Sequence, residues 1–123
     1  MSLSYEVSPE RNLVVATASG QVNRTDFDQL RSSILANDRI GPGMALLFDT
    51  DGAEPKLTFT DLNEIACRLQ QVFDKGIVRI AIVARSKFLY SLARTFGIFA
   101  ERERVRVKPF QKVEDANDWL SVA

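Results

Sequence analysis

The chain has 123 residues, of which 46% are hydrophobic and 26% charged, as is typical of one soluble globular domain. It contains no histidine, which removes the commonest general base and zinc ligand and excludes Ser-His-Asp and Cys-His catalysis. Its lone cysteine, Cys67, excludes intrachain disulfides and fits a reducing compartment. We therefore expect one domain, residues 1–123, in the cytoplasm, with neither a secretory signal nor a membrane span.

The charges are unevenly distributed although the net charge is zero. Residues 1–74 carry 6 basic and 11 acidic side chains, whereas residues 75–123 carry 10 basic and 5 acidic ones. A basic half attracts phosphates or anionic membranes. Sequence halves of an α/β domain interleave in space, however, so we expect this asymmetry to average out. Because the whole chain has no basic excess, we expect no nucleic-acid binding.

The first third of the chain predicts a hairpin followed by a helix. An alternating segment around Tyr5, a Pro-containing turn and the β-branched run Leu13–Ser19 favour two antiparallel strands. Asn23, followed three residues later by an aspartate, resembles a capping box. Apolar side chains recur at helical spacing behind it, so residues 24–36 should form an amphipathic helix.

The middle of the chain predicts strand, helix and strand. Met44–Phe48 is a continuous apolar run, as expected of a strand covered on both faces of a parallel sheet. After a polar loop, Thr58 or Thr60 is placed to cap a helix over residues 61–75. A second buried strand is predicted over Ile77–Ala84.

The last third predicts helix, edge strand and helix. Ser86 is placed to cap a helix with a broad apolar stripe. Valines then alternate with basic residues from Arg104 to Lys108, and Pro109 follows, which favours an edge strand with one wet face. A closing helix is predicted from Val113.

This order, β-β-α-β-α-β-α-β-α, predicts a single α/β domain with a mixed, mostly parallel five-stranded sheet and about four helices. In such a sheet a ligand crevice lies beyond the carboxyl ends of the parallel strands. The segments expected at that rim are Gly20–Asn23, Asp49–Thr60, Arg85–Lys87 and Phe110–Lys112.

Three residue patterns in this order resemble the STAS superfamily of anti-sigma-factor antagonist and sulfate-transporter domains, most closely its SpoIIAA-like branch. The patterns are Leu13–Ala16 leading to Ser19–Asn23, then Val78–Ala84 with an aromatic-rich helix, and finally Val105–Phe110 with Ala116 and Trp119-Leu120. The resemblance covers nearly the whole chain and implies a STAS-like fold.

If the resemblance extends to the anti-sigma-factor antagonists, it implies a Ser or Thr at the start of the helix after the third strand that a partner kinase phosphorylates. Thr58 and Thr60 match that acceptor by position only, because the Asp-Ser-Ser-Gly-like motif is absent. The loop before them is acidic and would repel a phosphate. A phospho-regulated partner-binding switch at Thr58 or Thr60 is therefore the alternative function.

The SpoIIAA-like branch usually lacks this motif, and its members have been proposed to carry apolar ligands or to touch membranes. The leading expectation is accordingly a non-enzymatic interaction or carrier module without cofactor or metal, which binds an apolar, amphipathic or lipid-like small ligand. Membrane contact would be peripheral at most, and a protein partner or a dimer is compatible with the sequence. The expected ligand-binding residues are Leu57, Phe59, Arg85, Lys87, Phe88, Leu92 and Phe96. The simpler interpretation of the Phe/Leu stripe is that it belongs to the core.

Three further interpretations are weaker. Lys108-Pro109 and Asp49 mimic a response-regulator receiver, but the acidic pair that holds Mg²⁺ there is missing. Asp49 and Asp51 lie two apart, as a metal site or an acid/base couple would, yet a turn explains them more simply. Cys67 falls beside Ala66 and is expected in the core rather than as a nucleophile.

Overall fold

A computed structural model of the chain describes residues 2–121. The helices and strands follow in this order: β1 Leu3–Ser8, the one-turn 3-10 helix η1 Pro9–Arg11, β2 Leu13–Ala18, β3 Gly20–Val22, α1 Arg24–Ala36, β4 Ala45–Asp49, β5 Ala53–Pro55, α2 Phe59–Lys75, β6 Arg79–Val83, α3 Lys87–Arg102, β7 Val107–Phe110 and α4 Val113–Leu120. Every helix and strand expected from the sequence is present, most with boundaries shifted by one to three residues.

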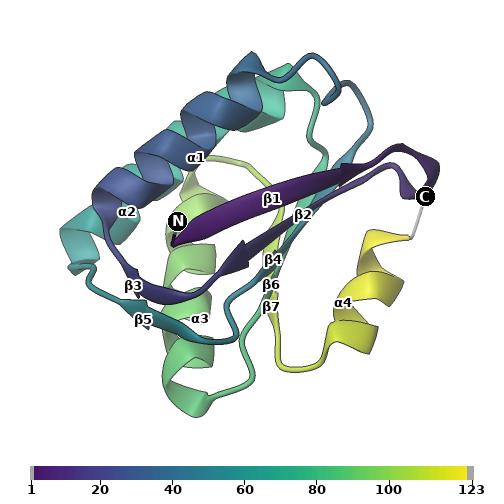
Figure 1. Cartoon of the computed structure of the whole chain (residues 1–123). Helices are drawn as coiled ribbons and strands as arrows, with labels where there is room; N and C mark the ends of the chain where they lie inside the picture. The colour runs from purple at the N-terminus through teal and green to yellow at the C-terminus, as the bar shows by residue number, and fades with distance from the viewer. Residues whose placement is uncertain (1, 122–123) are drawn as a thin grey trace.

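The main sheet has five strands in the order β1-β2-β4-β6-β7. Strands β1 and β2 are antiparallel, and every later neighbour is parallel, which confirms the predicted mixed, mostly parallel sheet. Helices α1, α2 and α3 cover one face and α4 covers the other (Figure 1). The alternation within β4 shows this, since Leu46 packs in the core cluster on the three-helix side and Leu47 in the cluster of α4.

A second, two-stranded parallel sheet of β3 and β5 was not predicted. Gly20 donates its N–H to Gly52 O at 2.9 Å, and Lys56 donates to Val22 O at 2.8 Å. The segment expected to be a polar loop is therefore partly fixed as a strand. The small sheet lies beyond the carboxyl ends of the main strands and places the chain entries to α1 and α2 side by side (Figure 1).

Helix starts agree with the sequence where capping residues indicate them. Asn23 and Asp26 form a complete capping box on α1, and Thr58 and Asp61 form one on α2, so Thr58 rather than Thr60 is the cap. Helix α2 consequently begins at Phe59, two residues earlier than expected.

One expectation was wrong, and another holds only in part. Cys67 is exposed rather than in the core, because each helical step turns by about 100° and Ala66 takes the inward position. The expected interleaving of the sequence halves holds only in part. The strands of the main sheet run in chain order, with β1, β2 and β4 on one side and β6 and β7 on the other, but α4 packs against β4, α3 packs against α2, and Arg85 pairs with Asp49 and Asp51.

The predicted edge strand is confirmed at β7, although it begins at Val107 and includes Pro109. Ile80 donates to Arg106 O and Ala84 to Phe110 O, so the residues between them, Val107 and Pro109, direct their backbone groups away from β6. Proline is tolerated there because its missing N–H faces outward.

Candidate functional site

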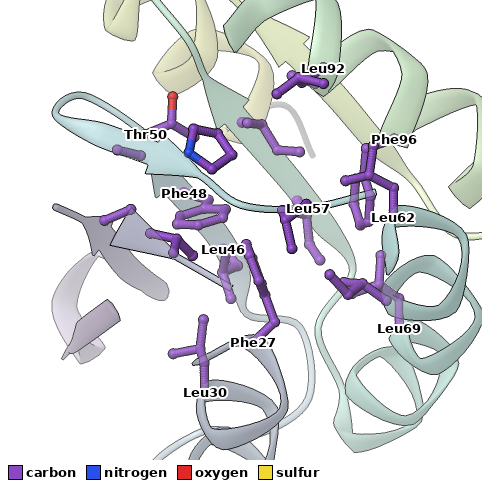
Figure 2. A pocket seen from close by; sticks show the side chains of 18 of the residues that line it. Phe27, Leu30, Leu46, Phe48, Thr50, Leu57, Leu62, Leu69, Leu92 and Phe96 are labelled. Carbon is purple, nitrogen blue, oxygen red and sulfur yellow. The ribbon is translucent and has the colours of Figure 1, made fainter. Parts of the chain in front are cut away.

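An apolar cavity of about 140 Å³ lies between the main sheet and helices α1, α2 and α3. Figure 2 shows side chains from all three helices and from β4 pointing into one space, closed on one side by the segment that carries β5 and Leu57. The lining side chains come from both halves of the chain: Ala18, Val22, Phe27, Leu30, Arg31, Ile34, Leu46, Phe48, Thr50, Ala53, Pro55, Leu57, Leu62, Ile65, Leu69, Val72, Ile80, Ile82, Leu89, Leu92, Ala93 and Phe96.

Only Arg31 and Thr50 in this lining carry polar side chains, and both are already engaged. The Thr50 hydroxyl donates to Val83 O at 2.7 Å, and the Arg31 guanidinium donates to Asp28 Oδ1 at 3.0 Å. Water needs two to four polar partners to occupy a cavity, whereas a space lined by Leu, Ile and Phe stays dry. The cavity is therefore suited to an apolar group.

The structure brings three of the seven predicted ligand-binding residues to this cavity. Leu57 lines it from the loop before α2, and Leu92 and Phe96 line it from α3. Phe59 and Phe88 do not line it. They lie in the first turns of α2 and α3 and are 68% and 63% exposed. Two apolar side chains therefore face solvent at the same end of the molecule as the carboxyl edge of the sheet.

The two predicted cations differ in their surroundings. Arg85 Nη1 lies 3.2 Å from Asp49 Oδ1 and 3.3 Å from Asp51 Oδ2, so its charge is balanced by two carboxylates. Lys87, the first residue of α3, is exposed and forms no ion pair within residues 2–121. Of the two, Lys87 is the one available to an anionic ligand.

Asp49 and Asp51 do lie together, but in a turn. The Asp51 N–H donates to Asp49 Oδ1 at 2.9 Å, and Arg85 bridges both carboxylates. Within residues 2–121, no three His, Cys, Asp or Glu side chains gather as a metal site requires. The turn and the Arg85 bridge account for this carboxylate pair.

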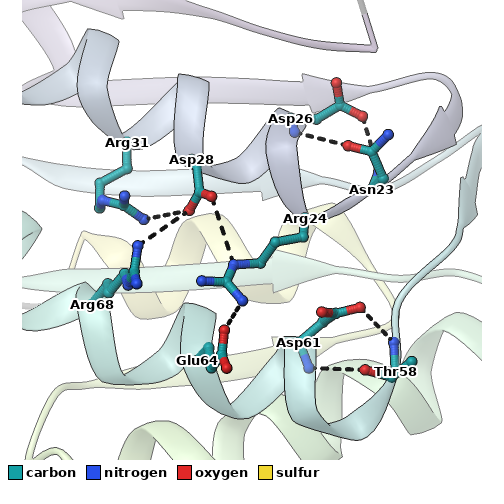
Figure 3. Close-up of polar contacts among 9 residues, drawn as sticks. All are labelled: Asn23, Arg24, Asp26, Asp28, Arg31, Thr58, Asp61, Glu64 and Arg68. Atoms are coloured by element: carbon teal, nitrogen blue, oxygen red, sulfur yellow. Dashed lines mark hydrogen bonds and ion pairs between the residues drawn. The ribbon is translucent and has the colours of Figure 1, made fainter.

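Thr58 and Thr60 sit at the start of α2. The Thr58 hydroxyl accepts from Asp61 N at 3.0 Å while Asp61 Oδ2 accepts from Thr58 N at 2.9 Å (Figure 3). A phosphate on Thr58 would disrupt this capping box and face the Asp61 carboxylate. Thr60 is exposed, with no hydrogen bond from its hydroxyl among the described residues.

An ion-pair network joins α1 and α2 beside the cavity (Figure 3). Arg24 pairs with Glu64 across the helices. The Asp28 carboxylate oxygens lie 3.0 Å from Arg31 Nη1, 3.6 Å from Arg24 Nε and 3.8 Å from Arg68 Nη1. Burial raises the pKa of the Asp28 carboxyl, but the hydrogen bond and charge of Arg31, with the charges of Arg24 and Arg68, outweigh it. The pKa of Asp28 therefore lies below its usual 3.8.

The sequence interpretation missed the side of the cavity formed by α1 and β4. Phe27 of α1 meets Phe48 of β4 edge to face, with ring centroids 5.7 Å apart, and both line the cavity. Their helical and strand periodicity was recognised, but both patterns equally describe an ordinary core. The unpredicted β5 adds Ala53 and Pro55 to the wall.

No family model matches the sequence, and no curated protein is significantly similar to it. Solved structures do match. An uncharacterized protein of the DUF3478 family with a SpoIIAA-like fold, from Shewanella loihica PV-4, is 23% identical over 96% of this chain and 91% of that one, with a TM-score of 0.61. The anti-sigma factor antagonist SpoIIAA in its unphosphorylated form is 12% identical over 98% and 99%, with a TM-score of 0.58. The chain thus has the SpoIIAA-like STAS fold. No helix within residues 2–121 is long and apolar enough to cross a membrane.

Proposed function

We propose that this protein is a non-enzymatic binding or carrier module for a small apolar or amphipathic ligand. The observation that supports the proposal is the apolar cavity of about 140 Å³ between the sheet and the three-helix layer. An engineered apolar cavity of about 150 Å³ binds benzene or xenon. The ligand we propose is therefore of the size of a single aromatic ring or a short branched chain, and not a long-chain lipid.

A cavity of this size has a cost in stability. Residual cavity volume destabilises a domain by roughly 24 cal/mol per Å³, which gives about 3 kcal/mol for this one. Domains are stable by only about 5–15 kcal/mol, and their interiors are otherwise packed like organic crystals. A ligand that fills the space recovers dispersion contacts that the lining side chains lack.

The amphipathic character of the proposed ligand depends on Lys87. This exposed cation begins the helix whose Leu89 and Leu92 line the cavity. A helix amino terminus also favours negative charge. A small carboxylate with an aromatic or branched apolar part, such as benzoate, combines both requirements.

Methyl NMR titration of the purified protein with toluene and with benzoate tests the proposal. We expect saturable shifts for methyl groups that line the cavity, such as those of Leu46, Leu57 and Leu92. Leu46→Phe should fill the space and weaken toluene binding by about tenfold or more. Leu47→Phe is the matched control, since the neighbouring Leu47 is equally buried but faces α4, and it should leave binding unchanged.

A charge variant tests the second part of the proposal. Lys87→Glu should weaken benzoate binding and leave toluene binding as in the wild type. Absence of any saturable shift with either compound, or equal loss of binding in Leu46→Phe and Leu47→Phe, would overturn the proposed function.

A further inference from the structure

A shallow groove of about 460 Å³ lies on the far edge of the sheet, away from the cavity. Its walls are the outer face of α3 and the edge strand β7, and it reaches around to Trp119 of α4 on the opposite face. Figure 1 shows α3 and α4 on the two sides of β7. A Cβ on Gly97 would lie 3.8 Å from Val107 O, so α3 approaches the strand closely at the floor of the groove.

The groove is basic, and its cations are not neutralised. Arg94, Arg106 and Lys108 line it and form no ion pair within residues 2–121, although the Lys108 ammonium lies 5.4 Å from the ring centroid of Phe110. Glu101 is the one carboxylate in the lining. All residues that line the groove belong to the basic second half of the chain, so no acidic side chain of the first half lies in its walls.

The groove also offers an apolar contact on a fixed support. Ile98, in its lining, is 55% exposed and is one of three large hydrophobic side chains that are more than half exposed among the described residues. Arg79 holds Trp119 in place. Its guanidinium carbon lies 5.7 Å from the indole ring centroid, and its Nη1 donates to Trp119 O at 3.1 Å. Val107 presents unpaired backbone polar groups between them, since β7 ends the sheet there.

We propose that this groove binds an acidic peptide segment of a partner protein, with an apolar side chain of the peptide against Ile98 and its carboxylates on Arg94, Arg106 and Lys108. Charge complementarity favours an anionic occupant. A peptide fits better than a nucleic acid, because the whole chain has zero net charge, and better than a membrane, because the groove is concave and exposes a single large aliphatic side chain.

Fluorescence anisotropy with the intact chain tests this proposal. The probe is a fluorescein-labelled synthetic peptide in which a central Leu-Leu pair is flanked by glutamates. We expect saturable binding that weakens with salt, and a loss of affinity of about tenfold or more in the double variant Arg94→Glu/Arg106→Glu. The control Arg39→Glu/Lys56→Glu makes the same charge change at exposed cations outside the groove and should alter affinity less than about threefold.

Ile98→Ser tests the apolar contact without changing charge. It should weaken the wild-type interaction several-fold and leave the affinity for an all-glutamate peptide unchanged. Equal losses in the two double variants would show nonspecific attraction and overturn the proposal. So would tighter binding of a single-stranded oligonucleotide or of phosphatidylserine vesicles through Arg94 and Arg106, since the groove would then be a general polyanion site. Circular dichroism establishes that each variant is folded before its affinity is compared.

Discussion

The cavity makes a stability prediction that needs no ligand. Leu46 and Leu47 are neighbours on β4, each 5% exposed, and differ in the face on which they pack. Leu46 borders the cavity, whereas Leu47 packs against α4 in a cluster without it. Replacing each by phenylalanine adds the same three carbon atoms at two equally buried positions, so the comparison isolates the space available on each face.

The expected effects have opposite signs. Burial of a Leu or Phe side chain contributes about 1.5–3 kcal/mol, so the larger phenylalanine gains up to about 1 kcal/mol over leucine, and strain in a well-packed core costs about 1–3 kcal/mol. Leu46→Phe places its ring edge in the 140 Å³ space, where little strain arises, and should change the free energy of unfolding by between zero and a gain of about 1 kcal/mol. Leu47→Phe has no such space and should lose about 1–3 kcal/mol.

Urea denaturation followed by circular dichroism measures both variants against the wild type, with the midpoint compared at constant m-value. If Leu46→Phe loses as much stability as Leu47→Phe, the space between the sheet and the three-helix layer does not exist in solution. The physical basis of the proposed function would then be refuted, independently of any ligand.

Three further predictions concern the elements that hold the cavity. Thr58→Ala should lower the free energy of unfolding by about 1 kcal/mol in the same assay, because it removes the cap of α2. Thr58→Asp should keep most of the stability that the cap contributes. Gly76→Ala should lower the free energy of unfolding by roughly 3 kcal/mol or more, because φ is +129° and a Cβ would lie 2.6 Å from the Pro42 Cα. Gly20→Ala, where φ is positive but the space around a Cβ is open, should lower it by about 1 kcal/mol. Asp28→Asn should be less stable than the wild type near neutral pH, and the gap should close as the pH falls below 3.8, since a carboxyl with a lowered pKa stabilises the fold only while ionised. A gap that widens in acid would contradict the ion-pair assignment.

Local signals were sufficient for most of the fold. The capping boxes at Asn23 and Thr58 mark helix starts directly, because cap and first turn are neighbours in sequence. The strands β3 and β5 carry no comparable signal. Each has three residues, too few to show alternation, and each is a strand only because the other lies beside it.

The cavity itself was beyond the sequence for a different reason. Apolar periodicity identifies which face of an element turns inward, but a core and a cavity wall have the same periodicity. Leu92 and Phe96 were proposed as lining residues from that stripe, as was Phe88, which is exposed in the first turn of its helix. Whether inward-facing side chains meet or leave a space depends on the distance between the main sheet and the layer of α1, α2 and α3. That separation is set by packing across the whole domain.

Helix α3 connects the two proposed sites. Leu92 and Phe96 are four residues apart and line the cavity, while Arg94 and Ile98, offset by two positions or about 200°, line the groove. An apolar stripe identifies only the first face, because the mixture of Arg, Gly, Ile and Glu on the second has no apolar period. What distinguishes that second face is the edge strand beside it, which brings Arg106 and Lys108 to the same groove. Because the two sets of side chains point in opposite directions from one helix, groove variants at Arg94 should leave toluene binding intact, and Leu46→Phe should leave peptide binding intact.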